Sequence, residues 1–442
     1  MTDRELRLSR RKFLTGAAAL TLAGTASGTA ATDKPPASPL ARPPRLDTSG
    51  RKPIAVLTTV YRPMSDSFHI ASRFLHGYVR FGAFHVPSFF VRGVSVDQTP
   101  DNDLSRSLSR EFGFHWSRNP TDVLLDGDKL AVDGVLLIAE HGNYPRNEKG
   151  QILYPRYEMF QQVIEAFRKA GRSVPVFCDK HLSHGWDKAK QMVEWAKERQ
   201  VPLMAGSSLP VTWRRPELEL PLGTPIDEAL VAAYGPNEVY GLHALEALQC
   251  MVERRLGGES GIRAVTYLTG RDVWKAGDAG QWSWDLLESA LGRSESVCPG
   301  DVRRNAGSAP IQSFPQIPPI AFLIEYRDGL RGTVLLLNGH VQDFTFAARL
   351  KGESKHPSCL FHVPPPPGAR SFDAVVMNIE KLLETGRPPY PVERTLLTSG
   401  ALDALMTSNQ RRGERIEAPE LDIRYLAPAD SGFIRGNIGS AS

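Results

Sequence analysis

The chain has 442 residues, 41% of them hydrophobic and 23% charged, which is the composition of a globular protein long enough for two domains. Its formal net charge is only +4, and no basic stripe with interleaved aromatic residues occurs, so we expect no nucleic-acid partner. Four scattered cysteines without a CxxC pair permit disulfides but do not imply them.

The first 31 residues have the pattern of a twin-arginine export signal. Arg10 and Arg11 precede an apolar Ala/Leu/Gly stretch, and small residues follow near Ala30. This run is too short and too rich in Gly and Thr to span a membrane, and no later stretch qualifies. We therefore expect a mature protein without a membrane span, either periplasmic or secreted; the alternative is a disordered basic tail. Residues 32–52, rich in Pro and Ser, are predicted to be a linker.

From residue 53 to 210, buried-strand patterns alternate with amphipathic helix patterns. Near-continuous Val/Ile/Leu strands separated by helices are typical of a parallel sheet covered on both faces. We therefore predict an α/β domain of the Rossmann type, resembling a nucleotide-binding domain. The predicted strands are 53–60, 89–97, 132–140, 174–180 and 201–208, and the predicted helices are 66–80, 103–114, 155–171 and 186–200.

Residues 211–442 have a different pattern and predict a second domain. A helix pattern at 241–258 leads to strand patterns at 261–270 and 320–340 without further regular alternation. Strands that follow one another in this way favour antiparallel pairing. We predict an α+β domain with a largely antiparallel open sheet and C-terminal helices, and we expect its sheet to pair in a homo-oligomer.

Several segments, taken in order, resemble the Gfo/Idh/MocA family, named after glucose–fructose oxidoreductase and inositol dehydrogenase. Within 174–214, Asp179-Lys180-His181 stands where the family has Glu-Lys-Pro, and Gly206 stands at the turn after the next strand. The stretch "YGLHALEAL" resembles the motif with the catalytic histidine, and 372–416 resembles helices that fold back on the first domain. Over roughly 53–425, the resemblance implies hydride transfer between NAD or NADP and a sugar or polyol bound between the domains.

The loop after the first strand departs from the family pattern. The family's phosphate loop uses glycine, because the backbone must approach the pyrophosphate closely at a helix start. The corresponding stretch here, "TTVYRPMSDSFH", contains none. We expect Pro63 and the side chains of Tyr61, Arg62 and Met64 to obstruct that approach, although Arg62 is also a candidate to grip a phosphate.

Two further residues are candidates to bind the cofactor. Asp97 ends the second strand, where an acid would hold the adenosine ribose hydroxyls; the alternative is a turn-forming aspartate. Glu140 ends the strand that, in the resemblance, precedes the nicotinamide region.

Lys180 and His243 are the candidate catalytic residues. Lys180 ends a strand at the carboxyl edge of the predicted sheet, facing the interdomain cleft, where it would hold a substrate hydroxyl; the alternative is a structural pair with Asp179. His243 matches the family's catalytic histidine, but Val239 replaces the acid that normally orients it, which leaves Glu238 or Glu246 as substitutes. The alternative for His243 is a locally hydrogen-bonded histidine at a helix start.

The remaining polar residues at this edge leave other functions open. Glu140, His141, His181 and His184 have the side-chain chemistry of a metal site, but their spacing matches no known motif, and we predict a polar pocket without metal. We therefore favour a sugar or polyol oxidoreductase that uses NAD or NADP. The alternatives are a non-redox carbohydrate-binding protein on the same scaffold and a metal-assisted carbohydrate enzyme.

Overall fold

The computed structural model describes residues 47–308 and 316–436 of the chain. The predicted export signal (1–31) and residues 32–46 of the predicted linker lie outside the described residues. Within the described ranges, none of the helices combines the length and the hydropathy needed to cross a bilayer.

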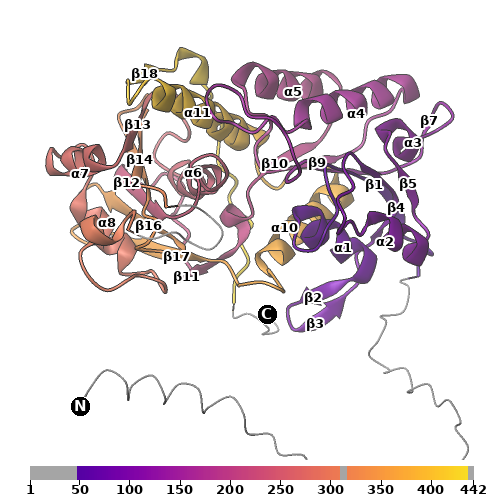
Figure 1. Cartoon of the computed structure of the whole chain (residues 1–442), viewed down its shortest axis with the longest axis horizontal. Coiled ribbons are helices and arrows are strands. Elements are labelled where there is room, and N and C mark those ends of the chain that lie inside the picture. The colour runs from indigo at the N-terminus through magenta and orange to yellow at the C-terminus, as the bar shows by residue number, and fades with distance from the viewer. Residues whose placement is uncertain (1–46, 309–315, 437–442) are drawn as a thin grey trace, which may run out of the picture. The chain divides into compact units, whose positions relative to one another are not determined.

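Among the described residues, the first sheet has six strands, and every neighbouring pair in it is parallel. The strands lie in the order β5-β4-β1-β8-β9-β10, so that the chain builds one half of the sheet outward from β1 and then the other half (Figure 1). This is the doubly wound order of Rossmann folds, in which ligands bind outside the carboxyl ends of the strands at the switch point, here between β1 and β8. The strands are β1 (Lys52–Thr58), β4 (Phe89–Val96), β5 (His115–Ser117), β8 (Val135–Ile138), β9 (Val176–Asp179) and β10 (Leu203–Gly206).

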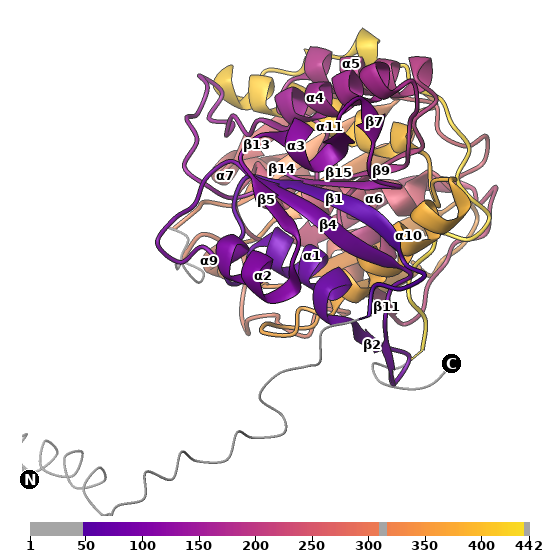
Figure 2. The ribbon, with the colours of Figure 1, turned by 90° about the vertical axis from the view of Figure 1, so that its right-hand side faces the viewer.

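Both faces of this sheet are covered, which explains why its strands are apolar throughout. Ile54 and Val56 of β1 pack in one hydrophobic cluster, whereas Ala55 and Leu57 pack in another. Figure 2 shows helices on both sides of the sheet. On one side lie α3 (Pro120–Leu124), α4 (Arg156–Ala170) and α5 (Trp186–Glu198), and on the other lie α1 (Asp66–His76), α2 (Ser105–Phe112) and α10 (Ser371–Thr385).

The first helix is shorter than the predicted 66–80. After α1, the strands β2 (Tyr78–Arg80) and β3 (Ala83–His85) form a hairpin instead. The helix ends at Gly77 because this residue has a φ of 74°, and a side chain on it would meet the Phe84 ring at 2.6 Å. A second short hairpin, β6 (Leu125–Asp126) with β7 (Lys129–Leu130), follows α3.

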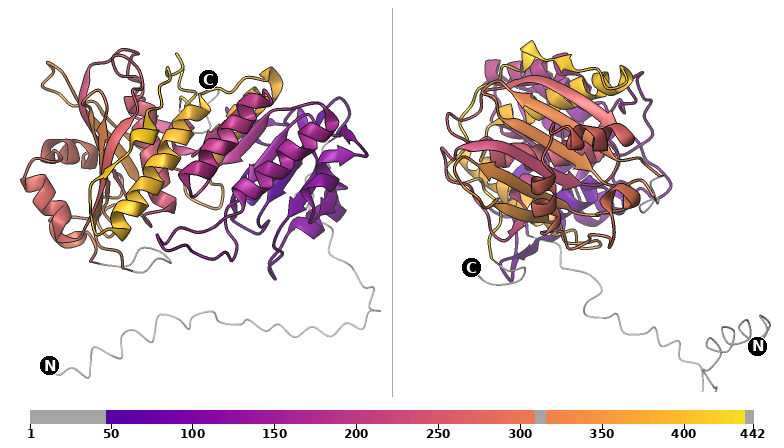
Figure 3. Two further views of the ribbon diagram at one scale, coloured as in Figure 1. Left: turned by 90° about the horizontal axis from the view of Figure 1, so that it is seen from above. Right: turned by 90° about the vertical axis from the view of Figure 1, so that its left-hand side faces the viewer.

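The second sheet has eight strands among the described residues, in the order β11-β17-β16-β12-β15-β14-β13-β18. Only β12 and β15 pair in parallel, and the other neighbouring pairs are antiparallel, so the predicted largely antiparallel sheet is confirmed. The right panel of Figure 3 shows this sheet from its outer side. Its strands are β11 (Trp213–Arg215), β12 (Ile226–Ala233), β13 (Ile262–Thr269), β14 (Ile320–Tyr326), β15 (Arg331–Leu336), β16 (Phe344–Leu350), β17 (Ser358–His362) and β18 (Ile416–Glu417).

Helices of the same chain pack on both faces of the second sheet. On one face, α6 (Val239–Val252) and α11 (Val392–Gln410) build the larger hydrophobic cluster. On the other face, α7 (Arg271–Asp278) and α8 (Trp284–Leu291) pack around Trp282, followed by the single turn α9 (Val302–Asn305). These contacts are all within one chain, so the expected pairing of two chains through this sheet stays a prediction.

Helix α11 joins the two sheets. On the side of the first sheet it contacts strand β10 and helix α5, and on the side of the second sheet it contacts strand β13 and helix α6. The left panel of Figure 3 shows α11 between the two sheets. The carboxyl end of β10 is thereby held against α6, the helix that carries His243.

Candidate active site

The loop after β1 makes a tight turn without glycine. The amide of Ser65 donates to the carbonyl of Arg62 at 3.1 Å, and Met64 takes a φ of 64° at the position where such a turn prefers glycine. A left-handed conformation at a residue other than glycine costs about 1–3 kcal/mol. Ser65 then caps α1 by accepting from the amide of Phe68 at 3.2 Å.

The expected obstruction by Tyr61 is wrong. The Tyr61 side chain is fully buried in the core and its hydroxyl hydrogen-bonds Ser72 at 2.9 Å, so it points away from the ligand side of the loop. Pro63 and Met64 are exposed, and the guanidinium of Arg62 has no hydrogen-bond or ion-pair partner within the described ranges. Arg62 is therefore available to a ligand.

Asp97 directly follows β4 and is exposed, as the ribose-binding role requires. Its amide donates to the carbonyl of Thr58 at 3.0 Å, which fixes it beside the end of β1. One carboxylate oxygen, Oδ2, accepts from the Tyr144 hydroxyl at 2.5 Å. In the described part of the chain no hydrogen bond reaches the other oxygen, Oδ1, which remains for a ligand hydroxyl.

Lys180 lies in the interior, not in an open cleft as expected. It is 6% exposed, and its Nζ contacts Asp66 Oδ1 at 3.0 Å and Asp179 Oδ2 at 3.1 Å. Burial disfavours the ammonium, but the two carboxylates raise the pKa of Lys180 above its usual value. Burial alone would raise the pKa of Asp66, yet Lys180 and His141 hold it well below its usual range, whereas burial raises the pKa of Asp179 to about 7. Asp66 is thus the permanent counter-ion of Lys180.

His141 completes this cluster from the loop after β8. Its Nε2 lies 3.3 Å from Asp66 Oδ2, and its side chain is 36% exposed. Burial lowers the pKa of His141, but the neighbouring Asp66 carboxylate outweighs it and raises the pKa above its usual value. His141 is therefore the solvent-facing end of the Lys180–Asp66 pair.

Glu140 is engaged by the protein itself. Its carboxylate accepts from Arg156, which in turn donates to His181 Nδ1 at 2.9 Å, and all three side chains are buried. Because arginine only donates, His181 carries its proton on Nε2, and burial keeps its pKa well below the usual value. The four residues of the alternative metal site do not form one cluster, since His141 pairs with Asp66. No group of three or more metal-binding side chains occurs in the described part of the chain.

His243 is oriented by Ser207 and not by either glutamate. Its Nδ1 lies 2.5 Å from Ser207 Oγ, which also accepts from the amide of Leu209 at 3.0 Å. Glu238 instead accepts from the amide of Ile152, and Glu246 accepts from Thr398. Burial and the nearby Lys180 charge lower the pKa of His243 to about 3, so the ring is neutral near pH 7.

A short chain of contacts joins the two predicted catalytic residues. The amide of Lys180 donates to the carbonyl of Gly206 at 3.1 Å, and Ser207, the next residue, holds His243. The structure therefore brings Lys180 and His243 to the same carboxyl edge, where Arg62 and Asp97 also lie, in the segments that follow β1 and β4. Sequence reasoning missed Ser207 and the role of Asp66; the available signals were that Ser207 is a polar residue directly after a strand and that Asp66 is an acid at the start of the helix after β1.

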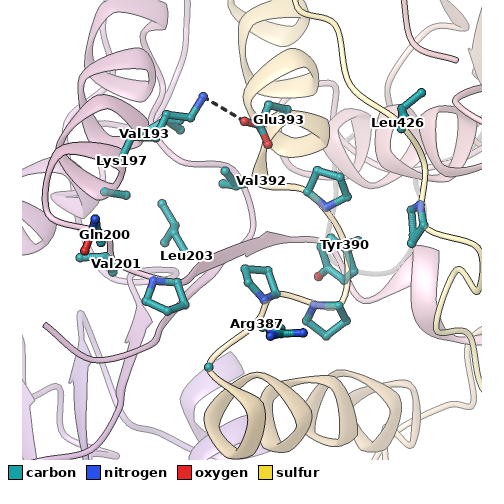
Figure 4. Close-up of a pocket in the computed structure, with 17 residues that line it drawn as sticks. Val193, Lys197, Gln200, Val201, Leu203, Arg387, Tyr390, Val392, Glu393 and Leu426 are labelled. Carbon is teal, nitrogen blue, oxygen red and sulfur yellow. Dashed lines mark ion pairs between the residues drawn. The ribbon is translucent and has the colours of Figure 1, made fainter.

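A pocket of about 540 Å³ lies at the opposite, amino end of β10 (Figure 4). It is lined mainly by apolar residues of α5, of 200–203 and of the proline-rich 386–393, and an ion pair of 2.9 Å between Lys197 and Glu393 lies beside it. None of the predicted site residues lines this pocket.

No model of a known protein family matches the sequence, and no curated protein matches it either. Solved structures do match. GenD2 from gentamicin A biosynthesis, in complex with NAD, is 16% identical with a TM-score of 0.52, over 85% of this chain and 99% of that one. The myo-inositol dehydrogenase of Lactobacillus casei, in complex with NAD(H) and myo-inositol, is 12% identical with a TM-score of 0.51, over 83% and 96%. A probable dehydrogenase of Thermotoga maritima is 14% identical with a TM-score of 0.50, over 84% and 99%.

These similarities extend over both sheets, since each covers more than four-fifths of this chain. At such low identity they concern the fold. The chain therefore has the fold of an inositol-dehydrogenase-like protein, a Rossmann domain followed by a largely antiparallel open-sheet domain, and its resemblance to the Gfo/Idh/MocA family holds at that level.

Proposed function

We propose that the protein is an oxidoreductase that transfers hydride between a sugar or polyol hydroxyl carbon and NAD or NADP. The main support is that Lys180 and His243 lie near each other at one edge of a doubly wound sheet. The amide of Lys180 donates to the carbonyl of Gly206, and the next residue, Ser207, contacts His243. The structures of GenD2 with NAD and of the Lactobacillus casei dehydrogenase with NAD(H) and myo-inositol support the choice of reaction.

The residues around the switch point fit a dinucleotide in three respects. Asp97 offers a free carboxylate oxygen beside the end of β1, and Arg62 offers an unpaired guanidinium at the turn before α1. The amides of Asp66 and Ser67 in the first turn of α1 have no hydrogen-bond partner within the described ranges. When bound, NAD(P) would supply the acceptor of the hydride that leaves the substrate carbon.

His243 would take the hydroxyl proton as the carbonyl forms. In the tautomer in which Nδ1 donates to Ser207, the lone pair on Nε2 is left for this proton, and the Ser207 contact holds the ring in place. Lys180 would stabilise negative charge on the substrate oxygen, with its own charge balanced by Asp66.

One observation favours a second function, a carbohydrate-binding protein without redox chemistry. The turn before α1 has no glycine and the first turn of α1 carries a buried acid, so the phosphate side of the site differs from a glycine-rich cradle. Such a protein would bind the same sugar or polyol at this edge but would leave it unchanged.

A combined experiment tests the proposal. Native mass spectrometry of the protein purified from its own export pathway would reveal a co-purifying dinucleotide, and NADH or NADPH formation would be followed over a panel of sugars and polyols. Substrate-dependent formation of the reduced cofactor is expected. Sugar or polyol binding without any turnover, with either dinucleotide added, would support the binding protein instead.

A further inference from the structure

We propose that the carboxylate of Asp66 is an internal anion on the phosphate side of the dinucleotide site, and that it keeps the affinity of this chain for NAD(P) low. The inference rests on the proposed function, because it concerns the cofactor of that site. The experiment below separates the failure of one from the failure of the other.

Asp66 stands where a pyrophosphate is bound in dinucleotide-binding Rossmann folds. It is the first residue of α1, the helix that follows β1, and the positive end of such a helix attracts an anion. In this chain the anion is supplied by the helix itself.

The contacts of Asp66 close the switch point between β1 and β8. Its Oδ2 lies 3.3 Å from His141, in the loop after β8, and the Thr59 hydroxyl donates to the carbonyl of Glu140 at 2.5 Å just beneath. The loops that follow the two central strands are therefore tied together at the point where the switch-point crevice opens in this fold.

Asp66 also uses the positive charges that a phosphate would need. Its carboxylate is the partner of both Lys180 and His141, and the residue is 7% exposed, so its charge is poorly screened by water. Its Oδ2 has no hydrogen-bond partner of good geometry within the described ranges, although it is buried. A phosphate placed here would meet a carboxylate that already occupies both cations, in a poorly hydrated position.

The backbone around Asp66 is held in an unusual conformation. Three residues other than glycine with left-handed φ surround it: Met64 at 64°, His141 at 67° and Lys180 at 66°. Each such residue is unfavourable and persists only where the surrounding contacts impose it. Two of the three, His141 and Lys180, are the ion-pair partners of Asp66, so the cluster is a built feature of this site.

The test compares the affinity of the full chain for NAD⁺, NADP⁺ and adenosine before and after Asp66→Asn, by isothermal titration. The dissociation constants of both dinucleotides should fall at least about tenfold, equivalent to 1.4 kcal/mol, whereas that of adenosine, which has no phosphate, should stay the same. Asp66→Ser is a second variant that keeps a good residue for a helix start, in case the asparagine variant does not fold. Circular dichroism confirms folding of each protein.

Asp187→Asn is the matched control. Asp187 is likewise an acid in the first turn of a helix at the carboxyl edge, in α5 after β9, but it is exposed, so its replacement should not change the affinity for NAD⁺. Unchanged dinucleotide affinity in both Asp66 variants, or an equal gain for adenosine, overturns the inference. A gain in affinity without turnover of any sugar or polyol, in the parent or the variants, leaves the inference standing and removes the proposed function.

Discussion

Ser207 Oγ and His243 Nδ1 lie 2.5 Å apart, and this contact connects the end of β10 in the first sheet with helix α6 on the second. The hydroxyl stands in for the acid that would precede His243 in the family pattern, where this chain has Val239. A hydroxyl orients the ring but supplies no negative charge, and burial and the Lys180 charge keep the histidine neutral.

Replacement of His243 by Ala should lower kcat by about 10²–10⁴-fold, the usual contribution of a positioned acid–base group. Ser207→Ala should lower kcat by less and leave KM unchanged, because Ser207 orients His243 and does not touch the substrate. The measurement is the rate of NADH or NADPH formation at saturating substrate. His115→Ala, which removes an exposed histidine on β5, should leave the rate as it is. An active parent whose rate survives His243→Ala would refute the assignment.

Arg62 should contribute to the binding of the phosphates even while Asp66 is present. We expect the parent to bind NAD⁺ with a dissociation constant near or above about 1 mM, and Arg62→Ala to weaken this further because it removes the unpaired guanidinium at the turn. Titration followed by NMR line broadening of the nicotinamide protons measures such weak affinities. Arg168→Ala, an exposed arginine on α4, is the control. Micromolar binding in the parent would show that the glycine-free turn forms a good cradle.

Asp179 and Glu238 should make a contribution to the free energy of unfolding that falls as the pH rises from about 4 to above 7. Burial raises the pKa of Asp179 to about 7, and burial also raises that of Glu238 to about 7, so the folded state binds these protons more tightly than the unfolded state. The stabilisation is therefore fully present below the unfolded value of about 4 and is lost through pH 7. Urea unfolding at several pH values measures this. The free energy of unfolding of the parent minus that of Asp179→Asn should fall over this pH range, whereas the same difference for Asp128→Asn, which removes an exposed acid, should stay constant. A constant difference for Asp179→Asn would contradict the shift.

The two sheets could be predicted because their strands leave a local signal. Ile54 to Leu57 are buried on both faces and therefore read as a continuous apolar run, and the same holds for β8 and β9. The hairpin at 78–85 was missed because its amphipathic residues continue the pattern of α1, and only Gly77 marks the end of the helix.

The site was less predictable, because its partners come from loops far apart in the sequence. Lys180 could be placed at a strand end, but that its charge is shared between Asp66 and Asp179 depends on how the loops after β1 and β9 fold. Ser207 illustrates the same limit, since nothing near it in the sequence indicates that a histidine from α6 will reach it. Strand ends identify candidates, but only the packing of the loops selects their partners.

Export is predicted to depend on the arginine pair at the N-terminus. Arg10→Lys together with Arg11→Lys keeps the charge but removes the pair that the twin-arginine pathway reads, so the precursor should accumulate inside the cell. Cell fractionation with immunoblotting measures the distribution. Arg4→Lys, which changes an arginine outside the pair, should be exported normally. Export of the double variant by the same pathway would show that the signal is of another type.

Lys180→Met should destabilise the fold, because Lys180 is buried and does not face an open cleft as expected from the sequence. The substitution leaves Asp66 and Asp179 as buried acids without their shared cation, a change that typically costs about 3–5 kcal/mol. Asp66→Asn combined with Lys180→Met removes both members of the closer pair and should recover a large part of this loss, because one carboxylate no longer needs a counter-ion. Free energies of unfolding of the parent, the single variants and the double variant form the cycle that measures the coupling. Lys188→Met, which removes a more exposed lysine paired with Glu158, should change stability by less than about 1 kcal/mol. If Lys180→Met lowers the free energy of unfolding no more than Lys188→Met does, water reaches the site freely and the buried ion pair does not stabilise the fold.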